Sequence, residues 1–247
     1  MNAFPTTADR STESQVRVAD SRGTTRIGWL DSRHSFSFGG YYDPRRMGFH
    51  GLRVINDDRI AAGQGFDTHP HRDMEILTWV LDGELAHRDS MGHASSLGAG
   101  GLQLMSAGSG VTHSEFNAQT DAPVHLLQIW MTPQKNGTPP RYQEAVPDPA
   151  SRSGRLVPLA TPEGRDGSLI LAADAAVYVG DFADGQADTY RPAPGRAVYL
   201  HVATGGVVVD GQTLSAGDAL ALDQATELNI RGDDPTPGQV LLFDLPA

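Results

Sequence analysis

The sequence predicts an all-β protein built from two small barrels in tandem. Three features predict this class: short runs of apolar and β-branched residues, turn residues between the runs, and a similar order of runs in the two halves. Glycine and proline supply 28 and 16 of the 247 residues and are scattered between the runs. Helical periodicity is weak, so we expect few helices and only short ones. The sequence suggests one of them at Arg141–Ala145.

Six runs have the composition and length of strands most clearly. They are Leu52–Asn56, Glu75–Leu81, Val124–Met131, Ala197–Ala203, Gly206–Val209 and Val240–Leu245.

The two halves share a pattern of strand, glycine turn, strand, glycine turn and strand. In the first half Trp79–Leu85 is followed by Gly98–Leu104, and in the second half His201–Val207 is followed by Leu214–Leu220. A tandem duplication of one small barrel accounts for both patterns.

A stretch rich in proline separates the halves. Residues 132–154 contain Pro133, Pro139, Pro140, Pro147 and Pro149 and few large apolar residues. Proline at this density interrupts strands and helices. We therefore predict an N-terminal barrel over residues 1–132, a proline-rich linker over 133–154 and a C-terminal barrel over 155–247.

The composition excludes several classes of protein. Thirty acidic and 19 basic side chains give a formal net charge of −11, which disfavours binding to nucleic acids and anionic lipids. The chain has no cysteine, so any metal must be held by histidine, aspartate or glutamate. No apolar run approaches the length of about 18 residues that spans a membrane, and the polar start Met1–Ser21 does not resemble a secretory signal. We expect a cytoplasmic protein without nucleic-acid or membrane partners.

Two short patterns carry the chemistry. His69 and His71 flank a proline, and His113 and Glu115 follow 42 residues later with the same spacing. Residues i and i+2 of a strand face the same side, so each pair projects together, and neighbouring strands would bring all four side chains to one point. Three imidazoles and a carboxylate suit iron, copper, nickel, zinc or manganese, and they leave coordination positions open for exogenous ligands.

Other residues of the same types have ordinary structural interpretations. We assign the remaining histidines to packing or to the surface: His34, His50, His87, His93, His125 and His201. Five phenylalanines are candidates for the wall of a planar substrate pocket, although core packing is the favoured interpretation of each: Phe36, Phe38, Phe49, Phe66 and Phe116.

The sequence around the histidines resembles pirin proteins, specifically the bacterial branch described as quercetin 2,3-dioxygenase-like. The spacing from Gly63 through His69 and His71 to Glu75 resembles the first cupin motif, and that from Gly110 through His113 to Asn117 resembles the second. Further stretches that match pirin proteins are 34–38, 52–58, 68–75, 89–92 and 105–115. The resemblance covers about the first 145 residues densely and the second half only in pattern.

The chain departs from the usual cupin motifs in two turns. The glycine that closes the first motif falls one place late, at Gly83, and Gly108 replaces the proline usual in the second. Both departures imply adjusted turns, and neither removes a candidate ligand.

The resemblance implies two cupin barrels, which are double-stranded β-helices of jelly-roll type, with one metal ion in the first. In pirins the metal carboxylate stands at the position of Glu115, whereas typical cupins use the position of Glu75. Spacing agrees with the pirin pattern, because Glu75 lies about 13 Å from His71 along an unbroken strand. We expect His69, His71, His113 and Glu115 as ligands, with Glu75 supporting the site or paired with an arginine. Iron(II) is the metal expected first, and Cu, Ni, Zn, Mn and Co are alternatives.

The resemblance also implies dioxygen-dependent opening of the central ring of a flavonol such as quercetin, with release of carbon monoxide. The partners would be a planar phenolic substrate and dioxygen, and Glu115 would be the general base. Two alternatives stay open: a non-catalytic metal-binding protein that senses redox state or regulates a partner protein, and a cupin enzyme without oxygen chemistry, such as an isomerase.

For the second barrel we predict no metal ion. The repeat aligns Arg191 and Ala193 with His69 and His71, and it aligns Ile230 and Gly232 with His113 and Glu115. A monomer is favoured over an oligomer.

Overall fold

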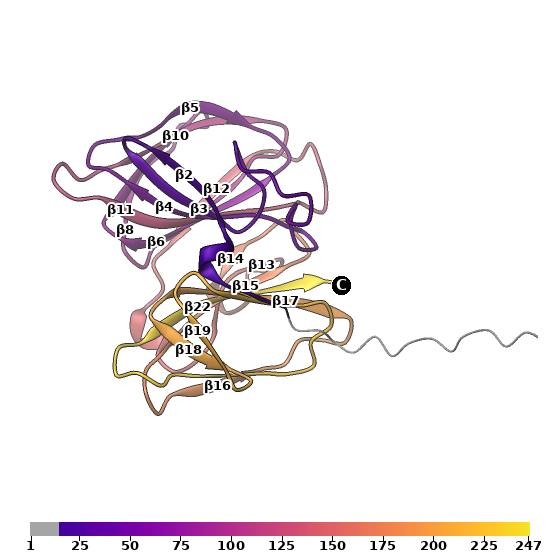
Figure 1. Cartoon of the computed structure of the whole chain (residues 1–247). Coiled ribbons are helices and arrows are strands. Elements are labelled where there is room, and N and C mark those ends of the chain that lie inside the picture. The colour runs from indigo at the N-terminus through magenta and orange to yellow at the C-terminus, as the bar shows by residue number, and fades with distance from the viewer. Residues whose placement is uncertain (1–14) are drawn as a thin grey trace, which may run out of the picture.

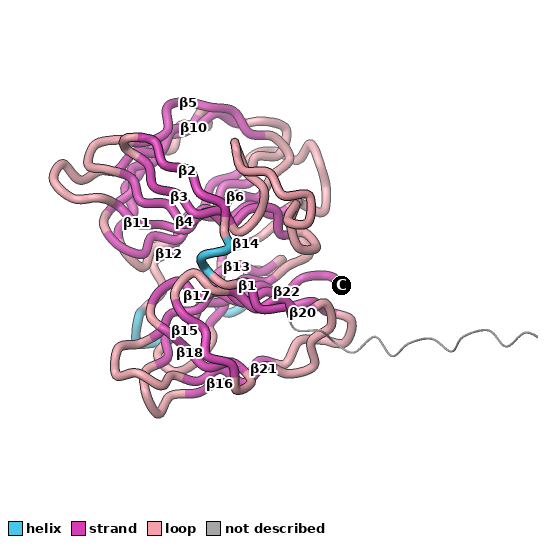
Figure 2. The backbone as a smooth tube through the Cα atoms, viewed as in Figure 1, coloured by secondary structure: helices cyan, strands magenta, loops and turns pink. Residues whose placement is uncertain are grey.

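The computed structural model describes residues 15–247, so the first 14 residues of the predicted first domain and of the polar start lie outside the described residues. The described part contains 22 strands in four sheets, together with three short 3₁₀ helices, η1 (Ala19–Ser21), η2 (Pro149–Arg152) and η3 (Arg165–Gly167). Figure 2 shows how strands dominate both halves. The predicted all-β class with few short helices is confirmed. Within residues 15–247, no helix is long and apolar enough to cross a membrane.

The first barrel consists of a seven-stranded and a four-stranded sheet. The seven-stranded sheet has the order β12 (Arg141–Ala145), β9 (Leu102–Ser106), β6 (Glu75–Asp82), β11 (Val124–Met131), β4 (Leu52–Ile60), β3 (Leu30–His34), β2 (Gly23–Ile27). The four-stranded sheet has the order β5 (Gly65–His71), β10 (Val111–Asn117), β7 (Glu84–Asp89), β8 (Ala94–Gly98).

The second barrel repeats this arrangement. Its seven-stranded sheet has the order β1 (Gln15–Arg17), β20 (Ala219–Leu222), β17 (Arg196–Thr204), β22 (Gly238–Pro246), β15 (Ala176–Phe182), β13 (Val157–Thr161), β14 (Leu169–Ile170). Its four-stranded sheet has the order β16 (Ala187–Tyr190), β21 (Leu228–Arg231), β18 (Gly206–Val209), β19 (Gln212–Ser215). The two barrels lie one above the other in Figure 1. The tandem arrangement predicted from the repeat is therefore confirmed.

All six strands predicted from apolar runs are present. They lie within β4, β6, β11, β17, β18 and β22. These strands are inner strands of their sheets, and their burial accounts for the apolar runs that predicted them.

The helix predicted at Arg141–Ala145 is wrong, because this segment forms strand β12. It pairs antiparallel with β9, with Tyr142 opposite Met105. So short a run carries little local preference, and the open edge of β9 determines its conformation by offering backbone hydrogen bonds. The predicted linker therefore contains a strand of the first barrel's sheet. In the same way β1 joins the second barrel's sheet by pairing with β20. Each barrel thus receives an edge strand from beyond its predicted boundary.

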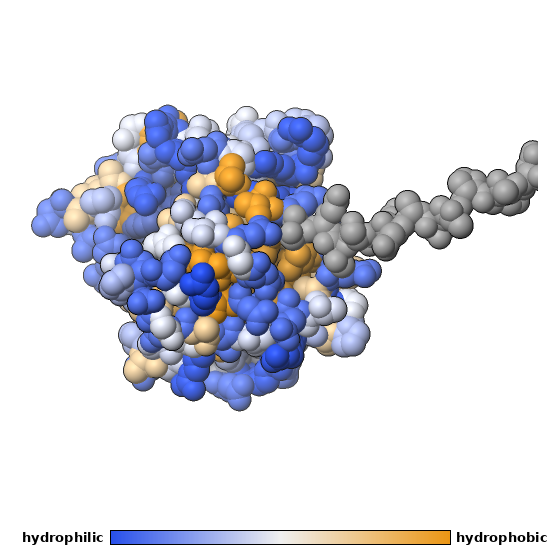
Figure 3. Space-filling view, turned by 60° about the horizontal axis from the view of Figure 1, so that its bottom comes forward, coloured by the Kyte–Doolittle hydropathy of each residue, from blue (hydrophilic) through white to orange (hydrophobic). Residues whose placement is uncertain are grey.

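The two seven-stranded sheets pack against each other through their outer faces. On β6, Leu77 and Trp79 face the second barrel and are fully buried. They meet apolar residues such as Val179, Leu241 and Phe243 of the second barrel in one continuous cluster. Such a face would otherwise expose a large apolar surface, so its burial holds the two barrels together. The outer surface is largely polar, and apolar residues collect in a band across the middle of the face in Figure 3.

A polar contact fixes the register of this interface. The indole Nε1 of Trp79 donates to Gln239 Oε1 at 2.8 Å, and Gln239 Nε2 donates to Asp181 Oδ1 at 2.8 Å. Asp181 also receives Arg152 Nε at 2.7 Å, and the Arg152 guanidinium lies 5.3 Å from the centre of a Trp79 ring. Trp79 therefore combines apolar burial with a directed hydrogen bond and a cation–π contact.

Replacing this tryptophan tests the interface. Trp79→Ala should lower the free energy of unfolding by about 3–5 kcal/mol, because it leaves a cavity between the sheets. The measurement is urea denaturation followed by circular dichroism. Val146→Ala is the matched control, since Val146 is 68% exposed and its change should stay within about 0.5 kcal/mol. A loss for Trp79→Ala no larger than that of the control would contradict this account.

Candidate metal centre

The two predicted histidine patterns lie on neighbouring strands. His69 and His71 are on β5, His113 is on β10, and His113 stands directly opposite His69 in the antiparallel pair. A β-bulge interrupts the register between His113 and Glu115, so that Glu115 stands opposite Phe66. The bulge adds one residue to β5, and bulges of this kind re-aim side chains beside functional sites.

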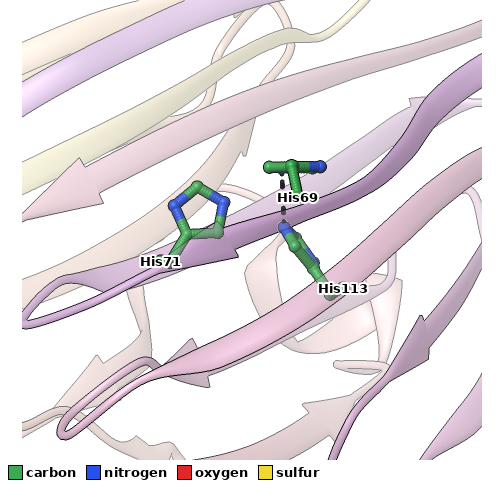
Figure 4. A group of neighbouring side chains, drawn as sticks. All are labelled: His69, His71 and His113. Atoms are coloured by element: carbon green, nitrogen blue, oxygen red, sulfur yellow. Dashed lines mark hydrogen bonds between the residues drawn. The ribbon is translucent and has the colours of Figure 1, made fainter.

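The three histidine side chains meet at one point of the first barrel. The Nε2 atoms of His69 and His113 are 3.1 Å apart, and each of the three rings offers a nitrogen within 4.8 Å of the others. Figure 4 shows the rings of His69 and His113 in contact with His71 beside them. Two ligands at about 2.1 Å from one metal ion, at right angles, are separated by about 3 Å. The pair of Nε2 atoms has the separation that a shared metal ion requires.

Hydrogen bonding and burial prepare the imidazoles to bind a metal ion. His69 Nδ1 donates to the carbonyl oxygen of Asp67 at 2.7 Å, and its Nε2 faces Nε2 of His113. Burial and the neighbouring histidines lower the pKa of His71 to about 4 and that of His113 to about 3. His71 and His113 are therefore neutral near pH 7, and neutral imidazole is the ligand form.

Glu115 is buried beside this cluster in a shell of donors. Its Oε1 receives Gln103 Nε2 at 2.6 Å and Thr78 Oγ1 at 3.2 Å, and its Oε2 receives Gln128 Nε2 at 2.8 Å. Glu115 is 3% exposed. Charge-assisted hydrogen bonds of this kind offset the cost of burying a carboxylate and fix its orientation.

The four predicted ligands form two overlapping groups. His69, His71 and His113 make one group, and Glu115 makes a second with His113 and His87. His113 belongs to both. His87, for which the sequence predicts a role in packing or at the surface, stands opposite Glu115 in the β7–β10 pair and is 3% exposed. Its Nε2 lies 3.2 Å from Asp89 Oδ2.

Glu75 lies on the opposite face of its strand. Its Oε2 receives Ser106 Oγ at 2.8 Å and the backbone N–H of Ala172 at 3.1 Å. Ala172 belongs to the second half of the chain, so Glu75 contributes to the contact between the barrels. Burial raises the pKa of Glu75. The strand alternation that points Thr78 inward points Glu75 outward, away from the histidines.

A cavity of about 720 Å³ opens over the histidine cluster. Its volume is in the range of sites for drug-sized molecules. Of the five candidate phenylalanines, Phe38, Phe66 and Phe116 line it. Phe36 and Phe49 instead pack against Tyr199 of the second barrel, with ring centres 5.5 and 5.7 Å away. Two further aromatic residues of the wall, Trp29 and Trp130, were not among the candidates.

The polar layer around Glu115, formed by Thr78, Gln103 and Gln128, was not predicted from the sequence. Thr78 is flanked on the inward face of β6 by Ile76 and Val80, which belong to apolar clusters on either side of the layer. Gln128 on β11 is flanked in the same way by Leu126 and Trp130. A polar residue at an inward position of an otherwise apolar strand was the available signal, and it acquires meaning only once the strand pairing is known.

The motif departure at Gly108 has a local explanation. Gly108 has φ +46°, a value that proline cannot adopt. A Cβ at this position would lie 2.1 Å from the carbonyl oxygen of Thr138, so the segment before β12 packs directly on the glycine backbone. The turn thereby accommodates the edge strand that the first barrel takes from beyond its predicted boundary.

In the second barrel, leucines occupy the positions that correspond to the polar layer around Glu115. Thr78 pairs with Gln103 and Gln128 in the first barrel, and Leu200 pairs with Leu220 and Leu242 at the same places in the second. All three leucines are in its apolar core.

The predicted alignment of the ligand positions is shifted and needs correction. Ile230 stands opposite Val209 as Glu115 stands opposite His87, so Ile230 corresponds to Glu115 and not to His113. Gly232 consequently does not correspond to Glu115. Leu228 pairs with Tyr190 as His113 pairs with His69, whereas Arg191 and Ala193 follow the end of β16. Glycine turns alone do not fix the register of strands that lie between them.

Comparisons with known proteins are consistent in both halves. The family model described as Pirin matches residues 15–131, and that described as Quercetinase C-terminal cupin domain matches residues 158–245. The quercetin 2,3-dioxygenase of Escherichia coli K12 is 46% identical over 231 residues, which are 94% of this chain and 98% of that protein. The crystal structure of the bacterial pirin YhhW from E. coli in complex with nickel(II) has a TM-score of 0.89 and 43% identity, with coverage of 95% and 99%. That of E. coli YhaK has a TM-score of 0.70 and 30% identity, with coverage of 93% and 95%.

Metal analysis separates the two glutamates. After reconstitution with nickel(II) and desalting, the protein should hold about one metal ion per chain, and Glu75→Gln should leave this value unchanged. His113→Ala should reduce it to below about a tenth, because it removes a ligand from both groups. Plasma mass spectrometry with protein quantification gives the ratio. Loss of metal in Glu75→Gln would reverse the assignment of the carboxylates, and a ratio near two would place a second metal ion in the chain.

Proposed function

We propose, starting from the fact that this chain belongs to the pirin family, that it is a metal-dependent dioxygenase acting on quercetin-like flavonols. The observation that carries the proposal is the cluster of three histidines on the wall of an aromatic-lined cavity. The name of the E. coli relative, which this chain matches over nearly its whole length, supports the same reaction and substrate class.

The metal would be held by His69, His71 and His113, with Glu115 as the fourth ligand. The 3.1 Å separation of two Nε2 atoms fits such an ion, and so does the hydrogen bond that holds Nδ1 of His69 away from the cluster. We infer a divalent transition metal and expect iron(II) first, while the crystal structure of the E. coli pirin in complex with nickel(II) supports a transition metal in this family. When bound, the ion would act as a Lewis acid toward a substrate oxygen and support the reaction with dioxygen.

The cavity would orient the substrate and exclude water. Phe38 and Trp130 meet edge to face with ring centres 5.4 Å apart, and Trp29 and Phe66 meet in the same way at 5.1 Å. Rigid aromatic walls of this kind favour a planar ring system, because they offer large contact areas with little side-chain entropy to lose. His71 packs edge to face on Trp130, with ring centres 4.9 Å apart, so the cluster is continuous with the wall.

Glu115 would accept the proton of the substrate's enolic hydroxyl. The O–H bond of the hydroxyl breaks, the proton moves to a carboxylate oxygen of Glu115, and the electron pair stays on the substrate oxygen. The resulting electron-rich enolate is the form that reacts with dioxygen to open the central ring. Gln103, Gln128 and Thr78 hold the carboxylate in place for this transfer, so no reorganisation is needed when the substrate arrives.

Oxygen uptake tests this function. Metal-loaded protein given quercetin should consume dioxygen and release carbon monoxide, and the His69→Ala/His71→Ala variant should do neither. Glu115→Gln should slow turnover by about 100-fold, because it removes the proton acceptor while keeping the size of the side chain. The rates are measured with an oxygen electrode, and the metal content of each variant is determined alongside.

Two outcomes would contradict the proposal. Absence of uptake at full occupancy with iron, copper, nickel or manganese would favour the regulatory, partner-binding alternative. Full activity of Glu115→Gln with its metal retained would show that another group accepts the proton.

A further inference from the structure

Asp58 is a buried carboxyl group without a full set of partners. It lies on β4 and is 3% exposed, and its Oδ1 has no hydrogen-bond partner among the described residues. The preceding residue differs sharply: Asp57 points to the other face of the strand, where it receives His125 at 2.7 Å and Arg22 at 3.1 Å. The strand therefore carries two adjacent carboxyl groups. The outward one is paired with two side chains, whereas the inward one has Ser32 of β3 beside it and keeps one oxygen, Oδ1, without a partner.

An unpartnered carboxyl group in a barrel interior is costly. A buried acceptor that loses its water costs about 1–3 kcal/mol when no donor replaces it, and a charged acceptor costs more. Burial, together with the carboxylates of Asp57 and Glu115, raises the pKa of Asp58 to about 7. The second barrel has no carboxyl group at this place: Gly180 stands opposite Val240 there, as Asp58 stands opposite Leu126 in the first barrel.

Asp58 lines the same cavity as the histidine cluster. It belongs to the seven-stranded sheet, whereas His69, His71 and His113 belong to the four-stranded sheet. The two groups therefore face the cavity from different sheets. A molecule held at the histidines and large enough to cross the cavity would meet Asp58 with another of its atoms.

The neighbouring polar residue is already engaged. Asn56 lies on the same face of β4 and lines the same cavity. Its Oδ1 is 2.7 Å from Nδ1 of His34, whose Nε2 is 2.8 Å from Thr25 Oγ1. These contacts engage the side-chain oxygen of Asn56, so the only polar atom of its side chain that remains for a ligand is the amide nitrogen, which is a donor. The Oδ1 atom of Asp58 is the acceptor on this wall that still needs a donor.

We propose that Asp58 determines substrate specificity by accepting a hydrogen bond from a hydroxyl group of the substrate, at a position distinct from the oxygen held at the histidine cluster. This inference rests on the proposed function, because it takes a hydroxylated planar aromatic molecule as the substrate. It narrows the substrate class to molecules with at least two separated oxygen functions, one for the histidine cluster and one hydroxyl donor for Asp58. An aromatic molecule that lacks the second hydroxyl would leave Asp58 buried without a donor and would bind poorly.

The experiment combines changes in the protein with changes in the substrate. Asp58→Asn and Asp58→Leu are compared with the wild-type protein and with Asp121→Asn, an exposed control. Dissociation constants for quercetin, and for analogues that each lack one hydroxyl, are measured by fluorescence quenching of metal-loaded protein without dioxygen. Steady-state KM and kcat are then measured in air.

Asp58→Leu should bind quercetin about 10-fold to 100-fold more weakly than the wild type, with a rise in KM that exceeds the fall in kcat. One analogue, the one without the contacted hydroxyl, should bind wild type and variant equally, whereas the other analogues should reproduce the difference seen with quercetin. Asp58→Asn keeps one carbonyl acceptor, so its dissociation constant for quercetin should lie between those of the wild type and Asp58→Leu. The thermal midpoint of the substrate-free Asp58 variants should stay level or rise, because an unpartnered carboxyl group is gone.

Three outcomes would overturn the inference. In the first, the wild-type protein binds and oxidises quercetin, and both Asp58 variants have the same dissociation constants as the wild type for every analogue. This outcome would leave the proposed function intact. The second is a lower thermal midpoint with uniformly weaker binding of all analogues, which would identify a structural role. The third is wild-type protein that neither binds nor oxidises quercetin, which would overturn the proposed function as well.

Discussion

The burial of one carboxylate organises the first barrel. Glu115 is enclosed between two apolar clusters, and a charge in such a place is tolerated only when donors surround it. Those donors come from three strands of the opposite sheet: Thr78 on β6, Gln103 on β9 and Gln128 on β11. The carboxylate therefore ties the two sheets together at the level of the histidines, and it determines which inward positions must be polar. The cavity, the histidine cluster and Asp58 all lie around this layer.

The second barrel shows what the same fold becomes without that carboxylate. With Ile230 in place of Glu115, the donors are no longer needed, and Leu200, Leu220 and Leu242 close the interior. Its seven-stranded sheet packs on the first barrel, through a contact that includes Trp79 and Gln239. One copy of the repeat provides a polar site, and the other provides a stable surface against which the site is built. Strand β1, which precedes the first barrel in the chain, pairs with β20 of the second barrel and so links the two copies.

Much of this could be predicted from the sequence, and the limits have physical causes. Strands such as β11 and β17 are predictable because most of their residues are buried and their sequences are largely apolar. The histidine patterns are predictable because alternation along a strand fixes which side chains project together. Strand β12 was not, because its conformation depends on the edge of β9. His87, Thr78 and Gln128 became recognisable only through strand pairing, which local sequence does not specify. The alignment predicted for the second barrel was wrong for the same reason, because the position of Ile230 becomes clear only from its pairing with Val209.

The central claim is that one metal ion sits between β5 and β10, held by the three histidines with Glu115. Anomalous diffraction from crystals of the nickel-loaded protein, recorded at the metal absorption edge, tests it most directly. The account predicts one strong peak within about 2.2 Å of a nitrogen of each of His69, His71 and His113 and of a carboxylate oxygen of Glu115. A peak bounded by His87, His113 and Glu115 and remote from His69 and His71 would contradict it, as would a peak beside Glu75.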